Sequence, residues 1–210
     1  MSLFATRNSL VQWLVALAMA ALLAGCGNDP AVSQPPLVIR SGDVCAVCGM
    51  YITHQPGPRG EAYVEAVSGA LKFDSTRDFF AYVTQPDVVS RLESAYVQDT
   101  ARIDWARPSN AADSFTDARK AYYVAWQPLS GGMGPTFASF ARRADADAFI
   151  RAHGGAVLRF DQITSALVST LGYRCPEPGS PFFKLAAQAH CANVSGDVPV
   201  PDNMPPDSSM

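Results

Sequence analysis

The sequence lacks a basic surface and the common motifs of catalysis. Only 17% of its 210 residues are charged, and the formal net charge is −3 at pH 7. Nucleic-acid-binding domains gather Lys and Arg on one face, so nucleic acid is not expected as a partner. The sequence contains no Ser-His-Asp arrangement, phosphate-cradling glycine loop or convincing pair of carboxylates. These absences favour a binding protein over an enzyme.

Long apolar runs are lacking as well, apart from one stretch near the N-terminus. Residues 10–23 are almost wholly apolar, but they fall short of the roughly twenty residues that a membrane-spanning helix needs. A polar segment with Arg7 precedes them, and a Leu-Ala-Gly-Cys motif ending at Cys26 follows. This pattern is typical of a secretory signal peptide, residues 1–25, that ends in a lipobox. It predicts acylation of Cys26 and attachment of the mature chain to a membrane.

The residues after the predicted lipidation site indicate a tether. Residues 26–36 are small, polar and proline-containing, which is typical of a flexible, lipid-anchored linker. Gly27 occupies the position at which an aspartate commonly retains bacterial lipoproteins at the inner membrane. We therefore expect an outer-membrane lipoprotein if the source has two membranes.

Cysteine is scarce and falls into two groups. Besides Cys26, the cysteines are Cys45, Cys48, Cys175 and Cys191. In an oxidising, exported compartment the two later ones are most simply a disulfide that staples the C-terminal tail, residues 172–210. Closing such a loop stabilises a fold by about 3 kcal/mol. The other interpretation is a second metal site made by both cysteines with His190.

Hydrophobic patterning predicts the same order of elements twice. The first set is a hairpin of residues 62–67 and 70–74, a helix from Ser75 or Thr76 to Pro86, and a strand at residues 93–100. The second set is a strand at residues 121–126, a strand at 136–141, a helix at 145–152 and a strand at 157–160. A unit with one helix buries little apolar area alone. We therefore predict an α+β fold of two similar ββαβ units packed together, residues 37–105 and 106–171, joined through residues 103–117.

One predicted loop concentrates sulfur. Residues 45–50, Cys-Ala-Val-Cys-Gly-Met, bring together two thiols and a thioether. Thiolates with thioethers favour Cu(I), whereas thiolates with imidazoles favour zinc. Cys48 would supply a thiolate, bound with loss of its proton, and Met50 a neutral thioether. Cys45 is either another ligand or the disulfide partner of Cys48.

A second methionine occupies the matching loop of the second unit. Met133 lies in a glycine-rich connection, residues 131–134, and we expect this loop to face residues 45–50 so that both units form one site. The alternative is that Met133 only fills space, a common role of methionine in cores. His54 and His153 are the candidate imidazole ligands, although His153 also suits the C-terminal end of its predicted helix.

Three segments of the chain occur in a recognisable combination. They are the Cys-x-x-Cys-Gly-Met motif at residues 45–50, the Met-Gly-Pro-Thr-Phe-Ala-Ser-Phe segment from Met133, and the His-Gly-Gly to Phe-Asp segment at residues 153–161. Together with the lipobox they resemble the NosL family, the lipoprotein accessory factors of nitrous oxide reductase. The resemblance runs from about Asp43 to about Thr164. One departure is Gly132, where family members commonly have proline.

The resemblance implies a periplasm-facing Cu(I) chaperone built from paired ββαβ domains. It would deliver copper for the catalytic copper cluster of nitrous oxide reductase. The implied partners are the membrane-associated maturation complex, which includes an ABC transporter and its periplasmic NosD partner, and the reductase itself. The tail from residue 172 has no clear place in the family core, so these implications stop before it.

Two other classes of protein use cysteines at this spacing. A membrane-tethered thiol–disulfide oxidoreductase would use Cys45 and Cys48. Such enzymes generally place the pair at a helix N-terminus, and Gly49 argues against a long helix here. A structural zinc module would take its four ligands from Cys45, Cys48, Cys175 and Cys191.

Overall fold

The structure is a computed structural model, and it describes residues 33–176. The predicted signal peptide, the predicted lipidation site Cys26, and the tail residues His190 and Cys191 lie outside the described residues. Within the described range, no helix combines the length and the apolar character needed to cross a bilayer.

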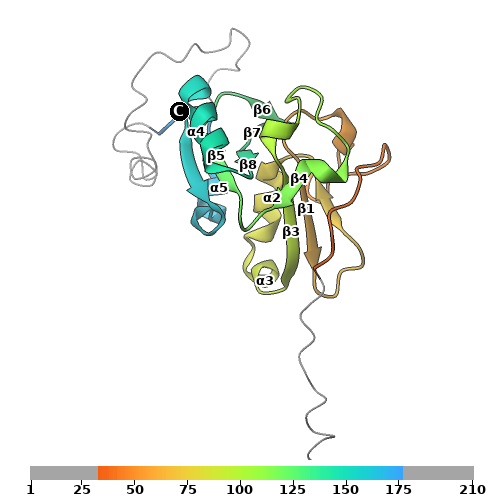
Figure 1. Ribbon diagram of the computed structural model, residues 1–210. Coiled ribbons are helices and arrows are strands. Elements are labelled where there is room, and N and C mark those ends of the chain that lie inside the picture. The colour runs from red at the N-terminus through yellow and green to blue at the C-terminus, as the bar shows by residue number, and fades with distance from the viewer. Residues whose placement is uncertain (1–32, 177–210) are drawn as a thin grey trace, which may run out of the picture. The chain divides into compact units, whose positions relative to one another are not determined.

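Two antiparallel sheets organise the described chain (Figure 1). Their strand orders are β2-β1-β3-β4 and β8-β5-β9. The strands are β1 (Gly60–Val64), β2 (Leu71–Phe73), β3 (Leu92–Gln98) and β4 (Phe115–Asp117) in the first sheet, and β5 (Tyr122–Ala125), β8 (Ala138–Phe140) and β9 (Ala156–Arg159) in the second. Helix α2 (Thr76–Val83) precedes β3, and helix α4 (Arg143–His153) precedes β9. The predicted α+β class is confirmed, and strand, strand, helix and strand follow one another in both sheets.

Helix α2 begins at a side-chain cap. The Asp78 backbone N donates to Ser75 Oγ at 3.2 Å, which satisfies one of the free N–H groups of the first turn. Its buried face includes Phe79, Phe80 and Val83. The helix ends at Val83. Pro86 then begins the short helix α3 (Pro86–Val89), because proline suits the first turn of a helix.

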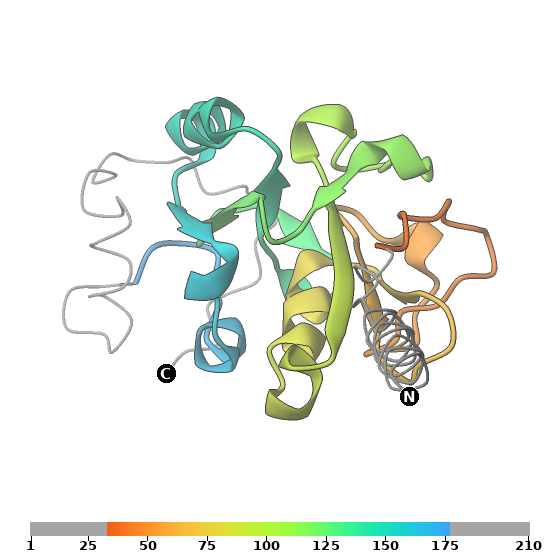
Figure 2. The ribbon, with the colours of Figure 1, turned by 60° about the horizontal axis from the view of Figure 1, so that its bottom comes forward.

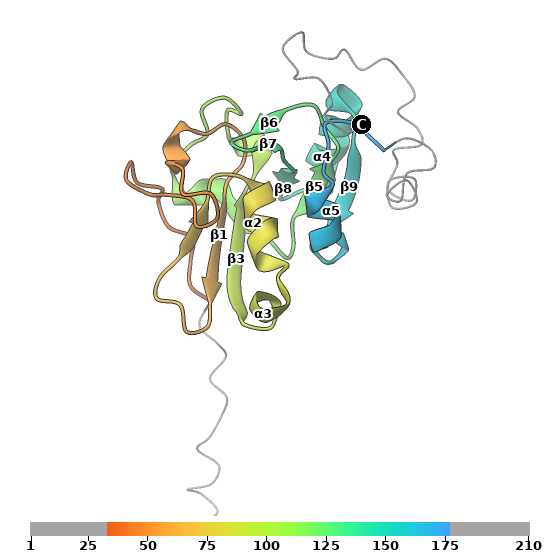
Figure 3. The same cartoon turned by 180° about the vertical axis from the view of Figure 1, so that it is seen from behind.

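The two ββαβ units share one core. The Phe80 ring on α2 meets the ring of Tyr123 on β5 at 4.8 Å between centroids, and that of Phe137 at 5.3 Å. Helix α5 (Ser165–Ser169) also packs against α2, and the two helices lie side by side in Figure 2 and Figure 3. The units are therefore packed together, with aromatic side chains of both buried in the same cluster.

Helix α4 covers the second sheet through a smaller apolar cluster. The cluster consists of Val124, Ala138, Phe140, Ala146 and Val157. After the helix the chain turns sharply at Gly155, which has a φ of +97°. An added Cβ there would lie 2.5 Å from the Ala125 carbonyl oxygen, so only glycine lets the chain turn this closely into β9.

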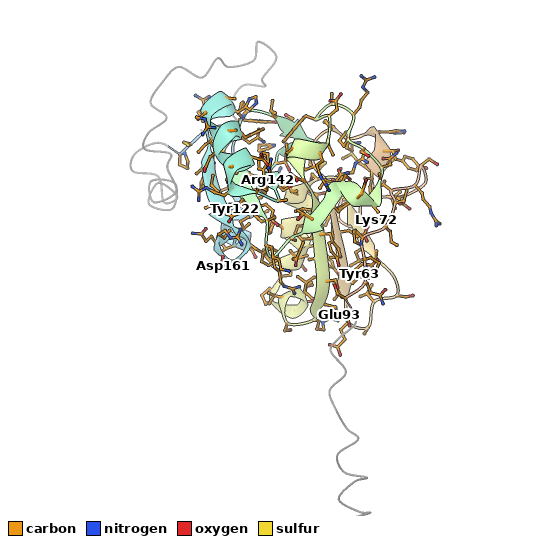
Figure 4. All side chains as sticks on the ribbon, in the orientation of Figure 1. Tyr63, Lys72, Glu93, Tyr122, Arg142 and Asp161 are labelled. Carbon is orange, nitrogen blue, oxygen red and sulfur yellow. The ribbon has the colours of Figure 1, made fainter. Side chains whose placement is uncertain are left out.

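Two segments lie closer to the first sheet than the sequence pattern indicates. Strand β4 belongs to the expected connection, beyond the predicted boundary at residue 105, and pairs with β3. Three residues are too few to show a strand periodicity. At the other end, the hydroxyl of Tyr63 (Figure 4) donates to the Pro35 carbonyl at 2.8 Å, and that of Tyr96 donates to the Gln34 carbonyl at 2.6 Å. The end of the predicted linker therefore contacts the fold.

Short elements complete the described chain. They are the 3-10 helices η1 (Ile52–His54), η2 (Thr100–Arg102), η3 (Ala112–Ser114) and η4 (Phe160–Gln162), and the two-stranded hairpin of β6 (Ser130–Gly131) and β7 (Gly134–Pro135). The Cys-Gly-Met loop directly precedes η1, and the β6–β7 hairpin carries Met133 at its tip. Both predicted halves of the site therefore lie in irregular segments.

Candidate metal site

The Cys-Gly-Met loop is closed by its own backbone and tied to β2. The Cys45 N–H donates to the Met50 carbonyl, and the Gly49 N–H donates to the Cys45 carbonyl, both at 2.9 Å. Gly49 has a φ of +73°, which glycine adopts without strain. The carbonyl of Lys72 on β2 (Figure 4) accepts from the Ala46 N–H at 2.8 Å. These bonds fix the backbone that carries both thiols.

Two carboxylates that no sequence motif marked lie beside the two thiols. Cys45 Sγ donates to Asp78 Oδ2 at 3.3 Å, and Cys48 Sγ donates to Asp74 Oδ2 at 3.5 Å. One ligand atom from each of the four residues lies within 4.8 Å of those of the other three. Among residues 33–176, these four are the group of His, Cys, Asp and Glu side chains that could hold a metal ion.

Both carboxylates belong to the start of α2. Asp74 directly follows β2, and Asp78 lies in the first turn of the helix, where a negative charge also suits the helix dipole. The spacing of four residues is the available sequence signal, but acidic residues around a helix start are common for capping alone. Only the fold shows that both carboxylates face the Cys-Gly-Met loop.

The Met133 hairpin reaches the same carboxylate from the second unit. At Gly132 an added Cβ would lie 2.5 Å from Asp74 Oδ2 and 3.0 Å from Gln55 Oε1, so the backbone there touches both side chains. Gln55 Nε2 in turn donates to Met50 Sδ at 3.9 Å. The two loops are thus brought together through Asp74 and Gln55, and Met133 lies beside this contact with its side chain 48% exposed. Figure 3 shows the β6–β7 hairpin near the start of α2.

Buried hydrogen bonds join the segment after the hairpin to α2. Thr76 Oγ1, in the first turn of α2, donates to the Phe137 carbonyl at 2.6 Å. The same oxygen lies 2.9 Å from Thr136 Oγ1, which follows β7. The first turn of α2 therefore contacts the Cys-Gly-Met loop through its carboxylates and the Met133 segment through its hydroxyl.

Burial raises the pKa of three of the four clustered groups. Removal from water is the largest cause of the raised pKa of Cys45, of Cys48 and of Asp74, and the neighbouring Asp78 charge raises the pKa of Asp74 further. Asp74 Oδ1 is also buried and has no hydrogen-bond partner. The two thiols therefore hold their protons near neutral pH, and a cation that replaces these protons would also give the unpaired Asp74 oxygen a partner.

The two candidate histidines lie outside this cluster. The His54 side chain is exposed on η1, with its ring 5.7 Å from that of Tyr51. The His153 ring packs on Phe149 of the same helix at 4.5 Å, in the last turn of α4, where a basic residue suits the helix dipole. Neither imidazole belongs to the group of four clustered side chains.

The cysteines of the described chain differ in their bonding state. Cys45 and Cys48 are free thiols. Cys175 is disulfide-bonded and packs against the core. Because Cys191 lies outside the described residues, its pairing with Cys175 stays a prediction. The zinc module with Cys175 as a ligand is wrong, since a sulfur in a disulfide is not available as a thiolate.

The fold and the site together define a class: an α+β protein of two packed ββαβ units with thiols, thioethers and carboxylates gathered where its two loops meet. The family model named NosL matches residues 36–168. The chain belongs to the NosL family.

Two relatives align with about three quarters of the chain. It is 42% identical to the copper-binding lipoprotein NosL of Stutzerimonas stutzeri over 159 residues, 74% of this chain and 80% of that one. It is 35% identical to the protein of the same name from Achromobacter cycloclastes over 160 residues, 75% and 81% of the two chains. The crystal structure of the copper chaperone NosL from Shewanella denitrificans superposes with a TM-score of 0.59 at 40% identity, covering 62% of this chain and 96% of that one.

Proposed function

We propose that this chain is a copper metallochaperone that binds its cargo as Cu(I). The names of the relatives support copper as the metal. The observation that carries the proposal is the contact between Gly132 and Asp74, the carboxylate that accepts a hydrogen bond from Cys48. This contact brings sulfur-bearing loops from both units beside one another.

The proposed copper ligands are Cys48, Met50 and Met133. A thiolate and thioethers are soft donors and select Cu(I) among biological metals. Cys48 is half-buried, whereas Cys45 is 2% exposed and bonded to Asp78. We therefore assign the first contact with copper to Cys48. Cys45 takes a supporting position, from which it becomes a further ligand once its proton leaves.

A chaperone must also give its copper away, and the proposed site is open on one side. Val47 on the Cys-Gly-Met loop is 46% exposed, and Val44 and Tyr51, which flank the loop, are 49% and 54% exposed. These fractions are close to the 48% of Met133. An incoming ligand of an acceptor protein could displace the neutral thioethers one after another while the closed backbone of the loop stays intact. Few and exchangeable ligands suit transfer better than storage.

The copper would serve the catalytic cluster of nitrous oxide reductase. The proposed partners are the maturation complex with its ABC transporter and periplasmic NosD partner, and the reductase itself. The lipoprotein names of the relatives support membrane attachment, which we assign to an acylated Cys26. We place the protein on the periplasmic side of the outer membrane.

Two other functions make different use of the same thiols. A thiol–disulfide oxidoreductase is disfavoured, because Cys45 and Cys48 lie in a turn and their raised pKa leaves little thiolate near neutral pH. Zinc binding is the second candidate, because two thiols and two carboxylates lie together and zinc accepts both kinds of ligand.

Metal competition distinguishes these functions. The reduced protein, purified in detergent, is titrated with Cu(I) against a chromogenic Cu(I) chelator, with and without excess Zn(II). We expect one Cu(I) per chain, held against the chelator and unaffected by zinc, and no turnover of a disulfide substrate. Displacement of Cu(I) by zinc, or rapid catalytic reduction of the disulfide, would contradict the proposal.

A further inference from the structure

Arg77 connects the first unit to the tip of the Met133 hairpin. It lies in the first turn of α2, between the two carboxylates that accept hydrogen bonds from the thiols. Its guanidinium Nη1 donates to the Met133 carbonyl at 2.8 Å, and its backbone N–H donates to Thr136 Oγ1 at 3.2 Å. One residue therefore contacts the hairpin at its tip and just after its second strand.

The hairpin needs such a contact because its own pairing is minimal. Strands β6 and β7 have two residues each and pair with one another in a separate two-stranded sheet. An isolated hairpin is marginally stable at best in water. Glycines at positions 131, 132 and 134 increase the conformational freedom that folding must remove at the tip. The position of Met133 must therefore be set by contacts from outside the hairpin.

Other side chains hold the base of the hairpin, and Gly132 lies against Asp74 and Gln55, whereas Arg77 is the side chain that bonds to Met133 itself. Trp105 Nε1 donates to the Ser130 carbonyl at 2.9 Å, and Ser130 Oγ lies 3.0 Å from the Tyr173 hydroxyl. Gln127 Nε2 donates to the Thr136 carbonyl at 2.9 Å. These bonds end at Ser130 and Thr136, whereas the Arg77 guanidinium bonds to the residue that carries the thioether.

We infer that Arg77 is a positioning residue for the copper site: it holds the Met133 backbone against the start of α2, so that the thioether is presented to the Cys-Gly-Met loop. The inference rests on the proposed function, because it requires Met133 to be a copper ligand. Arg77 itself does not bind the metal. Its effect on copper must therefore disappear when the Met133 thioether is removed.

A double-mutant cycle tests this requirement in the full chain, with Cu(I) affinity measured by chelator competition. We expect R77L to weaken Cu(I) binding by about fivefold, the net value of one typical hydrogen bond. We expect M133L to weaken it more, and R77L to have no further effect in the M133L background. R77K, which keeps a donor and the charge, should recover part of the loss. R151L removes an equal charge from an exposed position on α4 and should leave the affinity unchanged.

A second measurement needs no copper. Amide hydrogen exchange at residues 131–134 of the metal-free protein should become faster in R77L, while exchange in β1 and β3 stays as in wild type. Unchanged exchange at the hairpin would overturn the inference. So would a loss of affinity in R77L that is equally large with and without Met133, since that would be a general effect on charge or folding.

The cycle also separates this inference from the proposed function. If M133L weakens Cu(I) binding and R77L does not, the role of Arg77 alone is wrong. If M133L itself leaves the affinity unchanged, the proposed ligand set is wrong and the role of Arg77 is overturned with it.

Discussion

Gly132 lies against Asp74, so that the backbone of one ββαβ unit touches a carboxylate of the other. An added Cβ at Gly132 would lie 2.5 Å from Asp74 Oδ2, the atom that accepts the Cys48 hydrogen bond. A side chain at position 132 would therefore force the hairpin or the carboxylate to shift.

Substitution of Gly132 should therefore weaken copper binding. In G132A the new methyl group would lie 2.5 Å from Asp74 Oδ2 and 3.0 Å from Gln55 Oε1, so the hairpin or these two side chains must shift and the arrangement beside Cys48 changes. We expect about a tenfold lower Cu(I) affinity, comparable to the loss of other groups that support metal ligands. G172A is the matched control, since nothing lies within 4 Å of its added Cβ. Equal affinities of G132A and G172A would contradict the close contact.

The Asp74 carboxyl should destabilise the metal-free protein above about pH 4. Burial raises its pKa above the ordinary value of 3.8, so the folded state binds the proton more tightly than the unfolded state. Stability from this group is then fully present at low pH and is lost as pH rises through the raised pKa. At pH 7, D74N should unfold about 2–4 °C higher than wild type.

The difference between D74N and wild type should shrink as the pH falls through the raised pKa of Asp74 toward 4, because the carboxyl is protonated in both folded and unfolded chains at lower pH. The exposed Asp113 provides the control, because D113N should shift the midpoint little at any pH. Thermal unfolding followed by circular dichroism at pH 3.5, 5 and 7 makes the comparison. A D74N protein that is less stable than wild type at pH 7 would show that the charged carboxylate is instead stabilised by its surroundings.

Copper binding should release protons and become tighter as pH rises. The raised pKa of Cys48 means that the thiol is protonated near neutral pH and must lose this proton to bind metal. One displaced proton makes the affinity rise about tenfold per pH unit. Chelator competition between pH 6 and 8 measures the slope of the logarithm of the Cu(I) affinity against pH. The C48S substitution should lower this slope by about one, because one fewer proton is displaced. The same measurement on C45S decides whether Cys45 also binds as a thiolate.

The disulfide of Cys175 should close on Cys191. In urea without reductant, an alkylating reagent should label Cys45 and Cys48, which are the free cysteines of the described residues, and spare Cys175. C191S should make Cys175 reactive and lower the stability of the fold by about 3 kcal/mol. Labelling of Cys175 that is unchanged by C191S would assign its partner elsewhere.

Local patterns made much of the fold predictable. The Ser75 cap and the apolar face of α2 depend on residues a few positions apart. The same order of elements in the second unit supported the expectation of two packed units. Strand β4 was missed because three residues carry no period, and its place depends on pairing with β3. Short segments of this kind are determined by tertiary contacts.

The sequence pointed to the sulfur atoms near the candidate site, whose role as copper ligands stays a prediction, and not to the carboxylates that lie beside the thiols. Cys48, Met50 and Met133 stand out as soft donors, and the matching positions of their loops indicated that the two would meet. Asp74 and Asp78 read as ordinary residues of a helix start, since their contacts with thiols 26 and 33 residues earlier exist only in the folded chain. His153 differs, because its packing on Phe149 follows the i,i+4 spacing of a helix and agrees with the structural role that its place at the helix end suggested.

X-ray absorption at the copper edge tests the central claim, a site with ligands from both units. Spectra are compared for the Cu(I) forms of the wild type and M133L, with M50L as a second thioether variant. For the wild type, the account predicts that every atom coordinating Cu(I) is sulfur. For M133L, it predicts one sulfur ligand fewer. An unchanged sulfur shell in M133L, or a shell dominated by nitrogen in the wild type, would contradict it.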